Sequence, residues 1–269
     1  MPNNPRRPSL DTILAVTRTR VEALKQRAGE LERAAAQAPP VRPFPGKPEP
    51  TVGVIAEVKR RSPSQGAIRE DLDPVGHARA YARGGAVAVS VLTDEAHFGG
   101  SIEDLRQVAA AVSVPVLRKD FIINEAQIHE ARVAGASAVL LIARIVNAKQ
   151  LQGLARMVRS LDMVPLIEVH ADRELEAALA AGPSMLGVNA RDLDTFSVDL
   201  AAAERLVGRI PGGISVVAES GVETRADVER LAAAGADFVL VGTSVARSGD
   251  PERAVWGLVG VRRQSGVRG

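Results

Sequence analysis

Short runs rich in β-branched residues alternate with helical stretches from residue 52 almost to the C-terminus, and no other feature restricts the fold so strongly. This alternation is typical of a parallel sheet covered by helices. A closed barrel needs eight such units, whereas a doubly wound open sheet usually has fewer strands. The predicted strands number eight, at residues 52–59, 86–92, 115–119, 138–142, 165–169, 185–189, 215–219 and 238–242.

A second regularity in the same region favours closure into a barrel. A glycine precedes every second predicted strand and recurs roughly every 50 residues, which is the length of one βαβα unit. Glycine fits the position after a helix because the left-handed backbone costs it little. We therefore predict an α/β fold, a (β/α)8 TIM barrel. The glycines are Gly85, Gly135, Gly182 and Gly235, and prolines precede the intervening strands at Pro115, Pro165 and Pro211.

The length of 269 residues matches a single barrel domain, which typically has about 250. We expect one domain over residues 1–269, with the barrel at 52–258 and a basic tail at 259–269. Residues 1–51 form an N-terminal helical extension, in which Ser9 is the expected N-cap, followed by a proline-rich connector at 39–50. The helix has an apolar stripe that must pack on the barrel or on another subunit: Leu10, Ile13, Leu14, Val21 and Leu24.

Composition argues against several classes of protein. The chain has no cysteine, so disulfides and thiolate chemistry are ruled out. A net charge of +2 with only 3% aromatic residues does not suit nucleic-acid binding, which needs a basic stripe with stacking aromatics. Without a signal-peptide core or an apolar run of membrane-spanning length, we expect a cytoplasmic protein. Basic residues at the two tails are interpreted as an aid to solubility: Arg6, Arg7, Arg262, Arg263 and Arg268.

The first predicted strand has two different faces. Because side chains alternate across a strand, Ile55, Glu57 and Lys59 share one face, and the opposite face is aliphatic. The first face is apolar at its start and charged at its end, so we expect it to point into the barrel and to open at the C-terminal mouth, where barrel active sites lie. The same alternation brings six polar groups to this mouth: Glu57, Lys59, Lys119, Glu168, Asn189 and Glu219.

Two interpretations of these six groups are open. They could be a salt-bridge network that caps the core, but burying charges is costly and contributes little net stability. We favour the alternative, an active site. Two lysines among three glutamates shift one another's pKa values, so we expect one member to donate a proton and another to accept one near neutral pH.

The loops after the last two predicted strands are expected to bind phosphate. Ser220 and Gly221 follow the seventh strand, and Gly242 and Thr243 follow the eighth, at the position where barrels commonly hold phosphate. Glycines there let backbone N–H groups approach the anion. The loop at residues 60–66, which contains Ser62, is basic and could close over the same phosphate; a flexible surface loop is the alternative.

The four histidines show no metal-ligand spacing. We expect His77 and His129 to lie on helix surfaces, and it stays open whether His97 lines the mouth. The chain has neither a dinucleotide fingerprint nor a Walker loop. We therefore expect no metal and no organic cofactor.

Six stretches of the predicted strands and their loops match the signatures of a known family. They are residues 55–59 with 62–64, 91–94 with 98–101, 117–122, 165–169, 188–193 and 218–221. In these the chain resembles the indole-3-glycerol phosphate synthases of tryptophan biosynthesis, over nearly its whole length and in the family's order. The eighth strand departs most, because Gly242-Thr243-Ser244 stands where the family often has Ser or Glu and then Leu-Met. Backbone contacts to phosphate are expected to survive that change.

The resemblance implies a carboxy-lyase that closes 1-(2-carboxyphenylamino)-1-deoxyribulose 5-phosphate to indole-3-glycerol phosphate, with loss of carbon dioxide and water. Lys119 would be the general acid and Glu168 the base. Lys59 would be a second acid or, with help from Arg191, would hold the substrate carboxylate. The implied catalytic residues are Lys119, Glu168, Lys59, Glu57, Asn189, Glu219 and Ser220.

The remaining roles also follow from the resemblance. Glu57 and Asn189 would orient the lysines and the sugar hydroxyls, and Glu219 and Ser220 would bind the ribulose end. An apolar slot would hold the anthranilate ring, although core packing explains Leu140 and Leu193 equally well. The implied substrate-binding residues are Ser62, Phe98, Phe121, Leu140, Arg191, Leu193, Gly221, Gly242 and Thr243.

Two alternative functions stay open at this point. A phosphoribosylanthranilate isomerase or another phosphosugar barrel also needs an acid, a base and phosphate loops, but not an aromatic slot with two lysines. A catalytically silent barrel would bind a phosphorylated metabolite or a partner protein without turnover. The expected partner is a small phosphosugar substrate, with neither nucleic acid nor membrane. We expect a monomer or weak homodimer, and leave contact with neighbouring pathway enzymes open.

Overall fold

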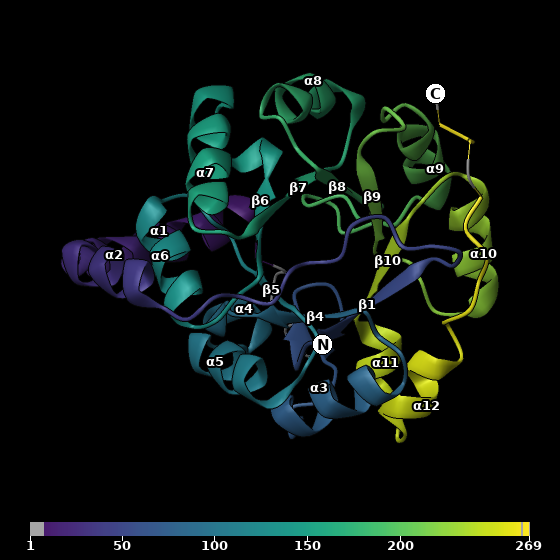
Figure 1. The fold of residues 1–269 in the computed structure, drawn as a ribbon, viewed down its shortest axis with the longest axis horizontal. Coiled ribbons are helices and arrows are strands. Elements are labelled where there is room, and N and C mark those ends of the chain that lie inside the picture. The colour runs from purple at the N-terminus through teal and green to yellow at the C-terminus, as the bar shows by residue number, and fades with distance from the viewer. Residues whose placement is uncertain (1–7, 265, 269) are drawn as a thin grey trace, which may run out of the picture.

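Eight parallel strands close into a barrel surrounded by helices, which confirms the predicted (β/α)8 fold (Figure 1). The computed structural model describes residues 8–264 and 266–268. The basic pair Arg6 and Arg7 lies outside the described residues. The barrel strands, which lie within two residues of the predicted bounds, are β1 (Gly53–Val58), β4 (Ala88–Leu92), β5 (Val116–Lys119), β6 (Ala138–Ile142), β7 (Val164–Val169), β8 (Met185–Asn189), β9 (Ser215–Glu219) and β10 (Phe238–Val241).

A helix follows every barrel strand, and several short elements are added on the loops. The surrounding helices are α3 (Pro74–Arg83), α5 (Ile102–Ala111), α6 (Glu125–Val133), α7 (Ala148–Ser160), α8 (Asp172–Ala180), α9 (Leu200–Gly208), α10 (Arg225–Ala233) and α12 (Pro251–Trp256). The additions are the hairpin strands β2 (Arg61–Ser62) and β3 (Gly66–Ala67), the helices α4 (Glu95–Phe98) and α11 (Thr243–Arg247), and the 3₁₀ turn η1 (Ala143–Ile145).

Strand alternation divides the apolar residues into two cores. Ile55, Leu117 and Leu166 belong to the core inside the barrel, whereas Val54 and Ala56 pack between the strands and the helices. The predicted inward and outward faces of β1 are therefore confirmed. Burial of both faces explains why the strands are continuous apolar runs in the sequence.

The four repeating glycines adopt the left-handed backbone that their spacing predicted. Their φ angles are 97°, 88°, 66° and 101° at Gly85, Gly135, Gly182 and Gly235. Each follows the C-cap residue of a helix, so the chain can reverse there and enter the next strand.

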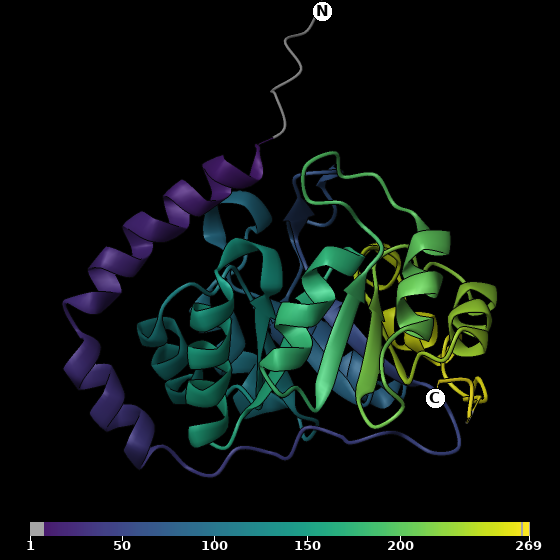
Figure 2. The ribbon, with the colours of Figure 1, turned by 90° about the horizontal axis from the view of Figure 1, so that it is seen from above.

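The N-terminal extension packs on the barrel. It contains α1 (Leu10–Lys25) and α2 (Ala28–Gln37), and the Ser9 side chain accepts from the Thr12 backbone N–H at 3.2 Å, as the N-cap prediction requires. Both helices contact α6, where Leu24 and Leu31 form a small core with Ala126. The two helices run along one side of the barrel, and the connector crosses beneath it to β1 (Figure 2). The apolar stripe is thus covered within the chain.

Two histidine predictions were wrong, because His77 and His129 are buried at 7% and 9% exposure. The ring of His77 contacts the Asp73 carbonyl oxygen at 2.9 Å and packs edge-on against Tyr81. His129 belongs to α6, which the extension covers. Helical periodicity alone cannot show that a second layer covers a helix.

The C-terminal tail anchors the barrel floor, which corrects the interpretation of its arginines as aids to solubility only. Asp237, at the N-terminal end of β10, is fully buried and accepts from Arg263 at 2.8 Å and from Arg268 at 2.5 Å. Its carboxylate also accepts from the Val216 backbone N–H at 2.9 Å. Within the described residues, no helix has the length and apolar character needed to cross a bilayer.

Removing the Asp237 carboxylate is expected to destabilise the fold. Asp237→Ala leaves two arginines and a buried N–H group without their partner, so the free energy of unfolding should fall by about 3–5 kcal/mol. Urea denaturation measures this change. Asp172→Ala is the control, because it breaks an exposed ion pair with Arg209 and should cost less than about 1 kcal/mol. Equal losses in the two variants would contradict the floor interaction.

Candidate active site

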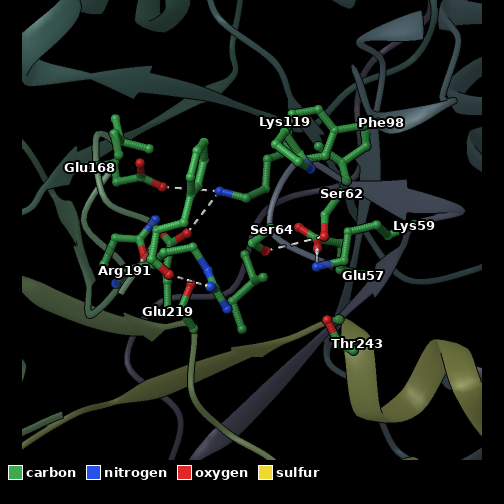
Figure 3. A pocket seen from close by; sticks show the side chains of 18 of the residues that line it. Glu57, Lys59, Ser62, Ser64, Phe98, Lys119, Glu168, Arg191, Glu219 and Thr243 are labelled. Carbon is green, nitrogen blue, oxygen red and sulfur yellow. Dashed lines mark hydrogen bonds and ion pairs between the residues drawn. The ribbon is translucent and has the colours of Figure 1, made fainter. Parts of the chain in front are cut away.

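A cavity of about 400 Å³ opens at the C-terminal mouth of the barrel (Figure 3). This volume lies within the range of small-molecule sites. Every residue predicted for the site lines it: Glu57, Lys59, Ser62, Phe98, Lys119, Phe121, Leu140, Glu168, Asn189, Arg191, Leu193, Glu219, Ser220, Gly221, Gly242 and Thr243.

Lys119 lies at the centre of the polar side of this cavity. Its Nζ is 3.0 Å from Oε2 of Glu168 and 2.9 Å from Oε2 of Glu219 (Figure 3). The three residues come from the ends of β5, β7 and β9, and both glutamates are buried. The carboxyl ends of parallel barrel strands lie at one rim. For this reason Glu168 and Glu219, which follow Lys119 by 49 and 100 positions, both contact its ammonium group.

A second pair, Glu57 and Lys59, lies at the end of β1. Lys59 Nζ is 3.0 Å from Oε1 of Glu57, whereas the buried Oε2 of Glu57 has no hydrogen-bond partner among the described residues. Gly242 leaves room for this pair, because a Cβ there would lie 2.5 Å from Oε1 of Glu57 and 2.9 Å from the lysine Nζ. Gly187 on β8 does the same for Glu219, since a Cβ would overlap its carboxylate.

Burial and neighbouring charges separate the pKa values of the two glutamates on Lys119. Burial and the neighbouring Glu168 carboxylate raise the pKa of Glu219 to about 8, although Lys119 opposes the rise. Burial also acts to raise the pKa of Glu168, but Lys119 and His170 outweigh it and hold that pKa well below its usual range. Burial acts to lower the pKa of Lys119, and the surrounding carboxylates reverse this and raise it. The Glu219 carboxyl group is therefore one that titrates near neutral pH.

An apolar slot lies beside the charged groups. The rings of Phe98 and Phe121 are 6.2 Å apart between centroids and inclined by 42°. Leu140 and Leu193 line the cavity and also pack with the inner core. Sequence reasoning missed further apolar lining residues; they include Leu10 and Ile13 from α1 and Phe196 from the loop after β8. The only sequence signal for Leu10 and Ile13 was the apolar stripe of the N-terminal helix.

The loops after β9 and β10 form the end of the cavity that was expected to bind phosphate. Ser220 has φ of 66°, a strained value for a residue other than glycine, and Gly221 follows with φ of 77°. The Ser244 hydroxyl donates to the Val222 carbonyl oxygen at 3.3 Å and so joins the two loops. This backbone turn lies at the cavity beside Gly242 and Thr243.

The loop after β1 is an ordered hairpin, and its arginines point elsewhere. Arg60 pairs with Asp104 at 2.6 Å, and Arg61 donates to backbone carbonyl oxygens of α4. Neither arginine lines the cavity, whereas Ser62 does, with its Oγ 3.3 Å from Oγ of Ser64. Arg60 and Arg61 therefore fasten the hairpin to neighbouring elements and do not line the cavity.

Three residues with implied roles also make contacts within the protein. The Glu57 carboxylate contacts Lys59, and the carboxylates of Glu168 and Glu219 contact Lys119. The side-chain oxygen of Asn189 accepts from the Arg191 backbone N–H at 3.0 Å, so it shapes the loop after β8. Arg191 itself donates to the Phe196 carbonyl oxygen at 2.8 Å.

The remaining histidines differ in their relation to the site. His97 belongs to α4, pairs with Asp94 at 3.3 Å and does not line the cavity. His170, for which sequence reasoning gave no role, lies 3.2 Å from Glu168. Its position two residues after Glu168, on the same side of the strand, was the available signal. Within residues 8–264 and 266–268, no group of three or more His, Cys, Asp or Glu side chains could hold a metal ion.

Solved structures with similar folds share little sequence with this chain. Thiamine phosphate pyrophosphorylase from Pyrococcus furiosus has a TM-score of 0.58 at 17% identity and covers 77% of this chain and 93% of its own. The N-acetylmannosamine-6-phosphate 2-epimerase from Clostridium perfringens has a TM-score of 0.56 at 15% identity and covers 72% of this chain and 88% of its own. At such identities the likeness concerns the fold alone.

Sequence comparisons identify the family. The family model described as indole-3-glycerol phosphate synthase matches residues 10–258. An indole-3-glycerol phosphate synthase from Mycolicibacterium smegmatis is 50% identical over 228 residues, which cover 85% of this chain and 84% of the relative. Indole-3-glycerol phosphate synthase 2 from Streptomyces coelicolor is 49% identical over 242 residues, covering 90% and 93%. The chain with Lys119 between two glutamates at the mouth of a closed barrel thus belongs to the indole-3-glycerol phosphate synthase family.

Proposed function

We propose that this chain converts 1-(2-carboxyphenylamino)-1-deoxyribulose 5-phosphate to indole-3-glycerol phosphate, carbon dioxide and water. Membership of the family supports the reaction, and the arrangement of Lys119 between Glu168 and Glu219 is the observation that carries the assignment of roles. The substrate has an aromatic ring with a carboxylate, a ketone and a phosphate. Each of these three parts has a matching region in the cavity.

The substrate lies across the mouth from the aromatic slot to the glycine loops. Its anthranilate ring packs between the side chains around Phe98 and Phe121, and its phosphate accepts hydrogen bonds from backbone N–H groups near Gly221 and Gly242. Lys59, with Arg191, faces the carboxylate of the ring. The ketone then lies near Lys119, and the bent substrate brings the ring carbon within attack distance of the ketone carbon.

The ring closure and the loss of carbon dioxide need one proton donor. The ring carbon that bears the carboxylate attacks the ketone carbon, and Lys119 protonates the ketone oxygen as it becomes a hydroxyl. An alkoxide is more basic than an amine, so this transfer is favourable even from a lysine whose pKa is raised. The carboxylate then leaves as carbon dioxide, and its bonding electrons restore the aromatic ring.

The dehydration needs both an acid and a base. Glu168, which stays ionised because its pKa is held low, removes the proton whose loss forms the double bond of the pyrrole ring. Lys59 protonates the hydroxyl, which departs as water. Glu219 retains a proton at neutral pH, so it orients Lys119 without competing with Glu168 as a base. Two adjacent carboxyl groups thereby take different roles.

Loss of the Lys119 amine should nearly abolish turnover. Lys119→Ala removes the proposed general acid, so kcat should fall at least about 100-fold. The assay follows indole fluorescence during turnover of the carboxyphenylamino-deoxyribulose phosphate. Lys149→Ala, on the exposed face of α7, is the control and should keep the wild-type rate. A folded Lys119→Ala variant with a rate near wild type would remove Lys119 from the mechanism.

The pKa of Glu219 also predicts a dependence of stability on pH. Because the folded-state pKa of about 8 exceeds the ordinary 4.5, the folded protein binds a proton between these values that the unfolded chain lacks. The stability that this group contributes is complete below the ordinary pKa of 4.5. It is lost as the pH rises toward the folded-state pKa of about 8, by up to about 1.4 kcal/mol per pH unit. Glu219→Gln imitates the protonated carboxyl and removes this loss.

Urea denaturation at pH 5, 6.5 and 8 tests this dependence. The unfolding free energy of Glu219→Gln should increase relative to that of the wild type as the pH rises. Glu176→Gln, which changes an exposed glutamate on α8, should show no such trend. A constant difference between Glu219→Gln and the wild type would contradict the raised pKa.

A further inference from the structure

His170 lies between two glutamates just behind the cavity. Its Nε2 is 3.2 Å from Oε1 of Glu168, and its Nδ1 is 3.5 Å from Oε2 of Glu174 on α8. The His170 side chain is 3% exposed, and the two glutamate side chains are 1% and 6% exposed. Neither contact has the alignment of a regular hydrogen bond, so both are short approaches between a ring nitrogen and a carboxylate oxygen.

The backbone around His170 holds the imidazole in this place. His170 directly follows β7. Glu168 lies two residues earlier, so strand alternation directs both side chains to the same side. The backbone N–H of His170 donates to Oε2 of Glu174 at 2.7 Å, which links the end of β7 to the first turn of α8. The Glu174 carboxylate therefore accepts from the backbone of His170 and also faces its imidazole ring.

The two carboxylates that contact Lys119 have different surroundings. Glu168 and Glu219 both contact this single ammonium group in a buried site, so one lysine faces two carboxylates. Of these two glutamates, Glu168 alone has a second basic neighbour among the described residues, with His170 at its other oxygen. The two carboxylates are therefore unequal: one lies between two basic groups and the other beside one.

We infer that His170 is a positioning residue which, as an imidazolium, keeps Glu168 a carboxylate and leaves the remaining proton of the glutamate pair on Glu219. This inference rests on the proposed function, because it explains why Glu168 is the base of that reaction. His170 does not line the cavity, so it acts through Glu168 and does not contact the substrate. Glu174 in turn holds the imidazolium and balances its charge.

The groups that face His170 support a charged ring. Glu168 from β7 and Glu174 from α8 face it, and the charge of Arg144 in η1 helps to lower the pKa of Glu174. Burial acts to lower the pKa of His170, but the two glutamates outweigh it and raise the pKa to about 9. The ring is then a cation throughout the neutral range.

A titration of the substrate-free protein tests the charge of His170 directly. Long-range proton–nitrogen NMR spectra report the protonation of all four histidines, and His170→Gln identifies the signal of His170. We expect a cationic ring at pH 7.5 that titrates near pH 9, and a lower midpoint in Glu174→Gln. Glu176→Gln on the same helix is the matched control and should leave the midpoint unchanged. A neutral His170 at pH 7 would overturn the inference.

The pH profile of turnover tests the action on Glu168. In His170→Gln the acidic limb of kcat/KM should move up by at least about one pH unit, which lowers kcat/KM about tenfold below that limb while higher pH restores it. Glu174→Gln should move the acidic limb of kcat/KM in the same direction by a smaller amount. This variant provides the test if His170→Gln does not fold. A structural role alone would lower the rate equally at every pH, and an unshifted limb in both variants would refute the inference.

The two readouts separate this inference from the proposed reaction. If the wild-type protein does not turn over the carboxyphenylamino-deoxyribulose phosphate, the proposed function fails, whereas the titration still decides the charge of His170. If the wild type is active and His170 is neutral, only the inference fails.

Discussion

The buried contact of Lys119 with Glu168 and Glu219 is the interaction on which the rest of the mouth depends. A lysine beside two carboxylates is stable there only if the surrounding protein supplies further polar contacts or leaves one carboxyl protonated. Here the barrel does both, because His170 faces Glu168 and the pKa of Glu219 is raised. The resulting asymmetry gives two chemically identical side chains different properties, as acid–base catalysis requires.

The barrel separates stability from chemistry at its two ends. At the floor, the Asp237 carboxylate is satisfied by two arginines from the C-terminal tail and by a backbone N–H. At the mouth, Glu57 keeps one buried oxygen without a partner among the described residues, and Ser220 has a strained backbone. Unsatisfied and strained groups of this kind are expected at functional sites.

Most of the fold and most of the site could be predicted from local sequence rules. Alternation along each strand placed Lys119, Glu168 and Glu219 on inward faces at strand ends, and closure of a parallel barrel brings such ends together. What the sequence could not reveal depends on tertiary packing. The extension covers α6 and buries His129, the first turn of α1 reaches the cavity, and the arginines of the tail meet Asp237 across the floor.

The residues at the barrel mouth are proposed to act together as a ring-closing active site. The most direct measurement is a turnover assay of the purified protein, offered the carboxyphenylamino-deoxyribulose phosphate and phosphoribosylanthranilate in parallel. We predict that indole fluorescence appears with the first substrate, with release of carbon dioxide, and that the second is not consumed. Isomerisation of phosphoribosylanthranilate, or binding of the first substrate without turnover, would contradict the account.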